Sequence, residues 1–252
     1  MTKYIALVFV SFASFGQPKG QKLVWQEDFN GTTLNEKEWN FEIGDGCPNI
    51  CGWGNNEKQI YTKNNHMIKD GKLIINIRKE GEGYTSTRIT TAAKKEFQYG
   101  RMEVKAKIPT GKGIWPAFWM LGSNIPKVGW PKCGEIDILE YVGREPDKVY
   151  TSLHTQDSHG NTINSKKTEF KNIEEGFHLY SIDWTKDKIE FFVDNQSVYK
   201  FSPDDKNENT WPFNQPFYFI INAAVGGNFG GHDVDNSIFP QEYLIDYIRV
   251  YQ

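Results

Sequence analysis

Residues 134–143 place three carboxylates among apolar residues. A buried carboxylate is costly unless it is paired, hydrogen-bonded or used in chemistry. The isoleucines, tyrosine and valine of this stretch favour a β-strand over a helix. On a strand, Glu135 and Asp137 share one face, and Glu140 falls on the other. One additional residue at positions 138–139, forming a β-bulge, would return Glu140 to the face of the other two.

Three acids in a row suit glycoside hydrolysis. One carboxylate attacks the sugar and a second protonates the leaving oxygen, and retaining enzymes hold the two about 5–5.5 Å apart. A third acid between them can share a proton with the nucleophile and separate the two pKa values. The alternative interpretation is an ordinary strand with solvated acids on its outer face.

The stretch also resembles the signature of glycoside hydrolase family 16, Glu-x-Asp-x-(x)-Glu on a central strand of a bent β-sandwich. The form with the additional residue, found here, is similar to the laminarinase-like, endo-β-1,3-glucanase branch, and the shorter form marks the bacterial lichenases. The resemblance extends from about Val24 to the C-terminus. It implies Glu135 as the nucleophile, Glu140 as the acid/base and Asp137 as electrostatic support for Glu135, with no cofactor for catalysis.

The rest of the chain predicts an all-β fold. Many short strands at regular spacing, Gly and Asn turns and almost no helix predict a two-sheet antiparallel β-sandwich. The family resemblance implies a concanavalin-like jelly roll with an open substrate cleft. The expected strands cover residues 22–29, 73–78, 99–108, 149–154, 177–184, 189–201, 217–224 and 244–251. Residues 194–195 are expected to form a hairpin turn within 189–201, and the strict alternation of 99–108 predicts a half-solvated strand with its lysines outward. A loop is expected at residues 47–56, and a flexible rim loop at residues 226–231.

The N-terminus is typical of a signal peptide covering residues 1–16. Lys3 provides the positive start, residues 5–12 are apolar, and small residues follow. Cleavage before Gln17 leaves residues 17–252 as a single catalytic domain. We therefore expect a secreted or periplasmic protein, and a monomer. The formal net charge of −3 predicts no attraction to nucleic acid or to a membrane surface.

The three cysteines are an odd number, which in an exported chain leaves at least one thiol free or intermolecular. The spacing of Cys47 and Cys51 allows a disulfide in a small loop. Without accompanying histidines the same spacing argues against zinc. Cys133 is interpreted as a small buried filler.

The family resemblance implies further contacts to the sugar chain. The matching positions are Asn56, Glu57, Arg88, Trp115, Trp119, Trp130, His154 and Asn222. Trp115 and Trp119 are four residues apart and share one face of an extended strand, where aromatic rings bind the apolar faces of sugars. Each assignment has a competing interpretation. One of the two rings could pack in the core, and Asn56 and Glu57 could simply be polar loop residues. Arg88 could be an ordinary surface arginine and His154 a structural histidine.

The resemblance also implies a structural calcium away from the cleft. Oxygen ligands suit calcium, and the family positions match Glu27, Gly71 and Asp246. The alternative for Asp246 is a salt bridge or solvent.

The predicted function is endo-acting, retaining hydrolysis of β-1,3-glucan of the laminarin type. Mixed-linkage β-1,3-1,4-glucan or a marine galactan such as agar or carrageenan stays open as the substrate, and so does a non-catalytic glycan-binding protein. A sulfated galactan would require clustered arginines and lysines, and the sequence offers Arg88 with scattered lysines. The loss of either glutamate would favour the binding protein, and both are present.

Overall fold

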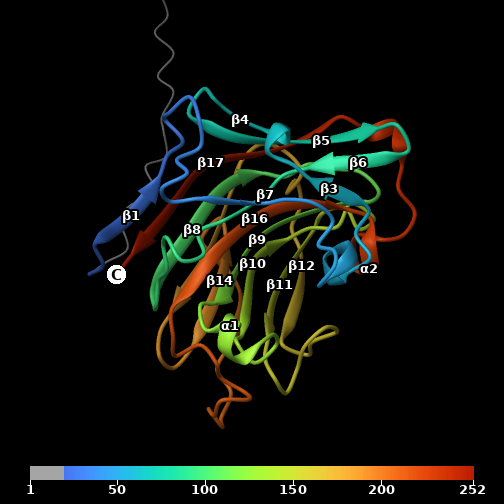
Figure 1. The fold of residues 1–252 in the computed structure, drawn as a ribbon. Helices are drawn as coiled ribbons and strands as arrows, with labels where there is room; N and C mark the ends of the chain where they lie inside the picture. The colour runs from blue at the N-terminus through green and yellow to red at the C-terminus, as the bar shows by residue number, and fades with distance from the viewer. Residues whose placement is uncertain (1–19) are drawn as a thin grey trace, which may run out of the picture.

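The computed structural model describes residues 20–252, so the predicted signal peptide lies outside the described residues. Two sheets pack against each other to form a sandwich (Figure 1). The larger sheet has the order β15-β14-β13-β8-β17-β5-β6-β3, with β1 beside β17 and β4 beside β5. Its strands are β1 (Leu23–Glu27), β3 (Gln59–Tyr61), β4 (His66–Lys69), β5 (Lys72–Glu80), β6 (Gly83–Ser86), β8 (Gly100–Lys107), β13 (His178–Trp184), β14 (Ile189–Val193), β15 (Gln196–Phe201) and β17 (Gln241–Tyr251).

The smaller sheet has seven strands in the order β12-β11-β10-β9-β16-β7-β2. Its strands are β2 (Asn40–Glu42), β7 (Arg88–Thr90), β9 (Ile114–Gly122), β10 (Glu135–Glu140), β11 (Lys148–His154), β12 (Ser165–Glu169) and β16 (Phe217–Val225). The helices are short: α1 (Ile125–Val128), α2 (Gly227–Gly230), and the 3₁₀ turns η1 (Cys51–Gly54), η2 (Lys63–Asn65) and η3 (Asn236–Ile238). Pairing is antiparallel throughout except between β3 and β6. The predicted sandwich is therefore confirmed. Within residues 20–252, no helix combines the length and apolar character needed to cross a bilayer.

The core lies between the sheets and is rich in aromatic rings. Alternation along β9 directs Phe118 into it, where the ring stacks on Phe219 of β16 at 5.1 Å. Trp39 and Trp184 are also fully buried. Because this packing uses one face of the smaller sheet, its other face is free to carry polar groups.

Strand β8 follows its prediction in part. Lys105 and Lys107 are directed outward as expected, yet Arg101 and Glu103 are only 8% and 4% exposed. They bond to each other (Nε to Oε2, 3.2 Å), Arg101 also binds Asp183, and Phe192 packs over the guanidinium. Burial is tolerated because each charge has a partner.

The cysteines follow the prediction. Cys47 and Cys51 form a disulfide in the loop before η1, and Cys133 is a buried free thiol. The predicted hairpin turn between β14 and β15 contains Asp194 and Asn195, both with positive φ. The predicted flexible loop at 226–231 instead contains the one-turn helix α2.

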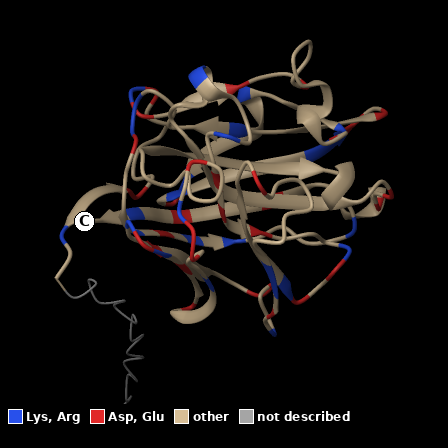
Figure 2. Ribbon diagram, turned by 90° about the horizontal axis from the view of Figure 1, so that it is seen from below, with Lys and Arg blue, Asp and Glu red and all other residues tan. Residues whose placement is uncertain are grey.

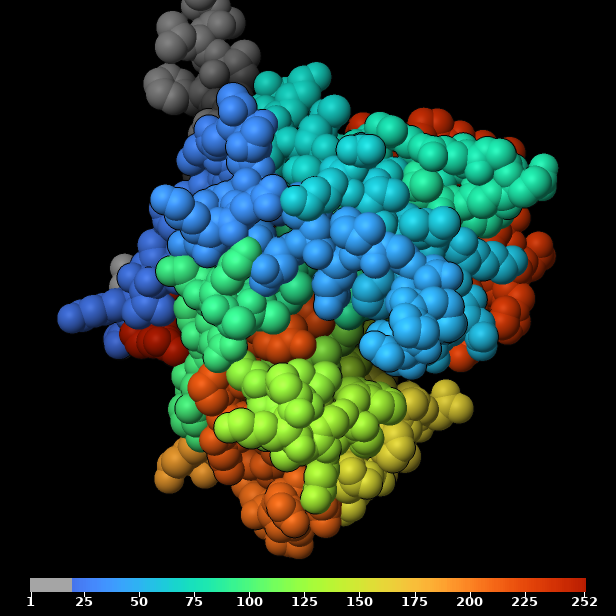
Figure 3. Space-filling model, viewed as in Figure 1, coloured from blue at the N-terminus to red at the C-terminus, as the bar shows by residue number. Residues whose placement is uncertain are grey.

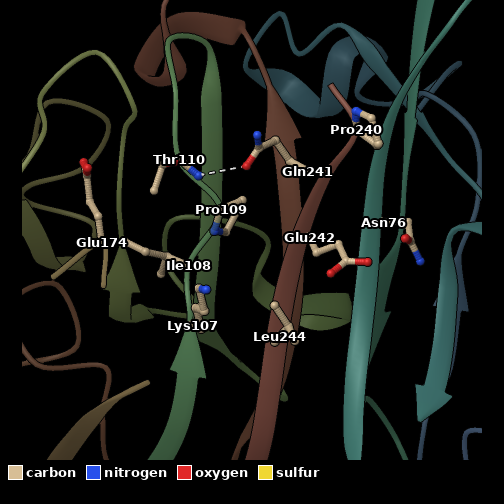
Figure 4. A pocket seen from close by; sticks show the side chains of 10 residues that line it. All are labelled: Asn76, Lys107, Ile108, Pro109, Thr110, Glu174, Pro240, Gln241, Glu242 and Leu244. Atoms are coloured by element: carbon tan, nitrogen blue, oxygen red, sulfur yellow. Dashed lines mark hydrogen bonds between the residues drawn. The ribbon is translucent and has the colours of Figure 1, made fainter. Parts of the chain in front are cut away.

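A hollow of about 420 Å³ lies over β5, β8 and β17 of the larger sheet (Figure 4). Its lining includes Asn76, Lys107, Glu174 and Glu242, and the N–H of Thr110 donates to Gln241 at its edge. None of the predicted site residues lines this hollow. The chemistry of the predicted acids therefore belongs to a different face of the molecule.

Candidate active site

Strand β10 contains the predicted bulge. In the ladder with β9, Asp137 pairs with Trp119 and Leu139 pairs with Phe118, so Ile138 has no partner. The ladder with β11 shifts register over the same interval. The prediction of a bulge at residues 138–139 is therefore confirmed.

The bulge directs the apolar side chains of β10 to one face of the sheet and the acidic side chains to the other. Ile138 and Leu139 both enter the core and are at most 1% exposed. Glu135, Asp137 and Glu140 lie on the opposite face, which we call the acid face. Successive acids lie opposite Leu121, Trp119 and Ala117 of β9, a spacing of about 6.6 Å along the strand.

The acid face continues across the sheet as a row of cross-strand partners. From β2 to β10 the row runs Glu42, Arg88, Asn222, Ala117 and Glu140. Directly opposed side chains of neighbouring strands interact. Sheet register thus places Arg88 and Asn222 in line with Glu140, although the three are far apart in sequence.

Burial and mutual charge alter the acidity of the three acids. Burial, together with the charges of Asp137 and Glu135, raises the pKa of Glu140 well above its ordinary value. Burial, and then the neighbouring Glu135, likewise raises the pKa of Asp137. The raised pKa favours the protonated form of Asp137, in which the carboxyl can share a hydrogen bond with Glu135. A raised pKa suits Glu140 to the role of the acid that protonates a leaving glycosidic oxygen.

His154 ends β11 directly opposite Glu135. Its Nε2 lies 3.2 Å from Oδ2 of Asp137 and 3.7 Å from Oε1 of Glu135. The structure thus places His154 beside Asp137 and Glu135. Among residues 20–252, His154, Asp137 and Glu135 form the cluster of His, Cys, Asp and Glu side chains with metal-ligand spacing.

Each glutamate receives one indole N–H. Trp130 Nε1 donates to Glu135 Oε2 at 2.7 Å, and Trp115 Nε1 donates to Glu140 Oε1 at 3.1 Å. Trp130 is 46% exposed, which leaves part of its ring accessible to a ligand. Trp115 and Trp119 are partly exposed and lie outside the main core cluster, and Trp119 packs against the small buried cluster of Leu121, Cys133 and Ile220.

A hydrogen-bonded chain supports Trp119 from below. Its Nε1 donates to Asn222 Oδ1 at 2.8 Å, Asn222 Nδ2 contacts the Tyr61 hydroxyl at 3.0 Å, and that hydroxyl donates to Glu57 Oε2 at 3.1 Å. Asn222 is 4% exposed and Glu57 is 9% exposed. Burial raises the pKa of Glu57. Both residues already bond to protein partners beneath the acid face.

Arg88 is 8% exposed and is held by three neighbours. It forms an ion pair with Glu42, and its guanidinium lies 4.5 Å from the Trp53 ring centroid and 5.0 Å from that of Trp119. Asn56, by contrast, is exposed and donates to Asn228 Oδ1 of α2 at 2.9 Å. In Figure 3 the light-blue segment with η1 and the yellow-green segment with α1 lie on the two sides of a hollow.

Sequence reasoning missed four participants: Glu42, Trp53, Tyr61 and Phe229. Trp53 lies inside the loop motif that was interpreted through Asn56 and Glu57, so a search for aromatic residues in that motif would have found it. Phe229 packs on Trp115 at 5.4 Å between ring centroids, in a loop noted for its glycines. Glu42 and Tyr61 have no local signal, because their roles follow from cross-strand register.

The predicted calcium ligands have protein partners. Oε1 of Glu27 accepts the N–H of Phe29 at 2.9 Å, and Asp246 Oδ2 lies 2.8 Å from Lys105 Nζ. Gly71 sits in a turn with φ of +67°. Both carboxylates are thus satisfied without a metal, and a calcium here would depend on main-chain oxygens or on the release of Lys105. Calcium binding by these residues stays a prediction.

Buried carboxylates in line beneath indole rings, on the face of a jelly-roll sheet, define a class of protein that cuts polysaccharides. Residues 54–249 match the family model described as "Glycosyl hydrolases family 16". The chain belongs to this family.

Relatives and solved structures agree with the family match. A beta-glucanase from Rhodothermus marinus is 36% identical over 274 residues, covering 100% of this chain and 94% of that protein. A glucan endo-1,3-beta-glucosidase from Cryptopygus antarcticus is 38% identical over 85% of this chain and 84% of its own length. The crystal structure of a laminarinase from Flavobacterium sp. UMI-01 superposes with a TM-score of 0.91 at 69% identity, covering 92% of this chain and 100% of that one.

The coupling between acids gives a pH-dependence that can be measured. Asp137→Asn keeps an N–H donor for Glu135 but removes the negative charge that Asp137 carries when it is ionised, and that charge helps to raise the pKa of Glu140. The pKa of Glu140 should fall, and the alkaline limb of kcat/KM, where the acid loses its proton, should move to lower pH. The dependence of kcat/KM on pH, measured at constant ionic strength for the parent and the variant, gives the shift. An alkaline limb that stays in place would show that Asp137 does not act on Glu140.

Proposed function

We propose that the protein is a secreted, retaining endo-β-1,3-glucanase that acts on laminarin-type glucans. The observation that carries the proposal is the bulge at Ile138, because it aligns two glutamates and one aspartate on a single face beneath three indoles. The names of the relatives and of the laminarinase structure support the β-1,3-linkage.

The proposed reaction has two steps. Glu135 attacks the anomeric carbon while Glu140 gives its proton to the departing glycosidic oxygen, which leaves a glycosyl group on Glu135. Glu140, now ionised, takes a proton from water, and that water attacks the same carbon and frees Glu135. Asp137 donates its hydrogen bond to Glu135 and so limits repulsion between the carboxylates. His154 faces both acids and supports their orientation.

We divide the predicted sugar contacts into residues that touch the sugar directly and residues that support them. Trp130, Trp115 and Trp119 offer ring surface, and the exposed Asn56 offers an amide. The nearly buried set supports these contacts from below: Glu57, Arg88 and Asn222. Arg88 in particular forms an ion pair with Glu42, so its charge is already neutralised by the protein. This favours a neutral glucan over a sulfated galactan.

Acidic and basic residues are interspersed along the ribbon (Figure 2). The mixture of signs and the formal charge of −3 do not favour a polyanionic glycan. Mixed-linkage glucan stays the second candidate substrate, because it also contains β-1,3-linkages and is uncharged.

A panel of polysaccharides tests the substrate. Laminarin, mixed-linkage glucan, agarose and carrageenan are each incubated with the enzyme, and new reducing ends are counted. We expect laminarin to yield them fastest, with a rapid fall in chain length that marks internal cleavage. Binding to laminarin without new reducing ends would instead indicate a glycan-binding protein.

Calcium removal gives a further expected result. If Glu27, Gly71 and Asp246 hold a calcium away from the acid face, a chelator should lower the melting temperature, because a ligand bound only to the folded state stabilises it. The catalytic rate below the melting range should stay nearly unchanged. Thermal scans with and without chelator, together with metal analysis of the purified protein, make the measurement. An unchanged melting curve with no metal in the protein counts against the site.

A further inference from the structure

Glu135, Asp137 and His154 present three ligand atoms that lie within 4.8 Å of one another. We propose that these residues form a binding site for a zinc-class divalent cation, and that a bound cation switches the enzyme off. The inhibitory part of this inference rests on the proposed function, whereas the binding part does not.

The two distances from His154 to the carboxylates are close to those of a four-coordinate ion. Zinc lies about 2.0–2.2 Å from nitrogen and carboxylate ligands in tetrahedral sites, so neighbouring ligand atoms are about 3.3–3.6 Å apart. His154 Nε2 lies 3.2 Å from Asp137 Oδ2 and 3.7 Å from Glu135 Oε1. Small side-chain adjustments therefore complete three corners of a tetrahedron.

Neither carboxylate ligand atom receives an indole N–H. Asp137 Oδ2 is buried and accepts no hydrogen bond, and the side chain is 4% exposed. Trp130 donates to Oε2 of Glu135 and leaves Oε1, the atom that faces His154. A buried carboxylate oxygen without a donor is costly, and a cation would satisfy it.

The donor set selects the kind of cation. One imidazole nitrogen with two carboxylates suits zinc and its neighbours in the transition series, whereas calcium and magnesium favour all-oxygen shells of six or more ligands. The side chains of Glu135 and His154 are 17% and 12% exposed, so the fourth corner opens toward the acid face. A cation on Glu135 Oε1 would engage the lone pair that attacks the sugar.

Calorimetric titration with zinc chloride tests binding without any need for turnover. The parent and Glu140→Gln, which retains all three ligands, should each bind one zinc. His154→Gln should weaken binding at least ~10-fold, since even outer-sphere changes at metal sites cost 10–100-fold. His159→Gln is the matched control, because His159 is exposed and packs on Trp130 at 5.3 Å but lies outside the ligand set.

Inhibition is measured separately on the substrate that the polysaccharide panel identifies. At a free zinc concentration ten times the dissociation constant, the initial rate should fall about 11-fold and should recover on chelation. A β-1,3-gluco-oligosaccharide should weaken zinc binding to Glu140→Gln. No zinc binding by the parent, or equal binding by folded His154→Gln, would overturn the proposed site. Zinc binding that leaves the rate unchanged would overturn the switch, and zinc binding by a protein that cuts no glycan would count against the proposed function alone.

Discussion

Glu135→Gln should abolish glucan hydrolysis, with turnover reduced on the order of 10⁴-fold or more, because no other group can form the glycosyl-enzyme. Glu140→Gln should reduce turnover of laminarin by ~10²–10⁴-fold, the contribution of a positioned general acid. Both amides are close in size to the carboxyl groups that they replace, so folding should be retained. Initial rates and thermal unfolding of each variant make the measurement.

The two roles can be separated with an aryl glycoside whose leaving group departs without a proton. Glu140→Gln should form the glycosyl-enzyme from it at nearly the parent rate, and Glu135→Gln should stay inactive. Glu169→Gln is the matched control, because Glu169 is exposed on β12 of the same sheet. Its rates should equal those of the parent. A folded Glu135→Gln variant with the turnover of the parent would contradict the assignment of Glu135 as the nucleophile.

Deletion of Ile138 should give a folded protein with activity reduced by ~10²-fold. Ile138 has no partner in the β9 ladder, so its loss produces strict alternation and keeps Glu135, Asp137 and Glu140 on the acid face. The activity loss follows from changed spacing, since a misplacement of about 1 Å can cost 10²-fold. One buried aliphatic side chain is lost as well, so stability should fall by about 2–5 kcal/mol.

Deletion of Ile136 is the matched control, because it removes the same residue type from the same strand. Ile136 is paired with Met120 on one side and Leu153 on the other. Its deletion moves every later side chain of β10 to the opposite face or breaks both ladders, and we expect an insoluble protein. Expression, circular dichroism and initial rates compare the two deletions. Equal loss of folding in both would contradict the structural account of the bulge.

The active strand could be predicted from sequence because its signals are local. Apolar residues with β-propensity fixed the strand, and three acids that needed a common face required the bulge. Strand β8, with its alternation, and strand β16, with its nearly continuous apolar run, were predicted for the same reason. Strand β12, with the sequence Ser-Lys-Lys-Thr-Glu, was missed, because an exposed edge strand has no apolar face to produce a pattern.

The supporting residues were harder to predict, since cross-strand register decides them. Arg88 was expected to reach a sugar, but the strand pairing places Glu42 beside it and two indoles against its guanidinium. Asn222 was expected to contact the sugar. In the structure its amide accepts a hydrogen bond from Trp119 and donates one to Tyr61. No spacing in the sequence indicates which neighbour a side chain meets across a sheet.

The central claim is that Glu135 forms a covalent bond to the sugar and that water replaces it on the same face. Proton NMR of the earliest hydrolysis products of laminarin tests it most directly, before the free sugar equilibrates. Two successive inversions at the anomeric carbon predict that new reducing ends appear first as the β-anomer, with the α-anomer growing later through mutarotation. An α-anomer that appears first would contradict the account, because a single displacement by water leaves no role for Glu135 as the nucleophile.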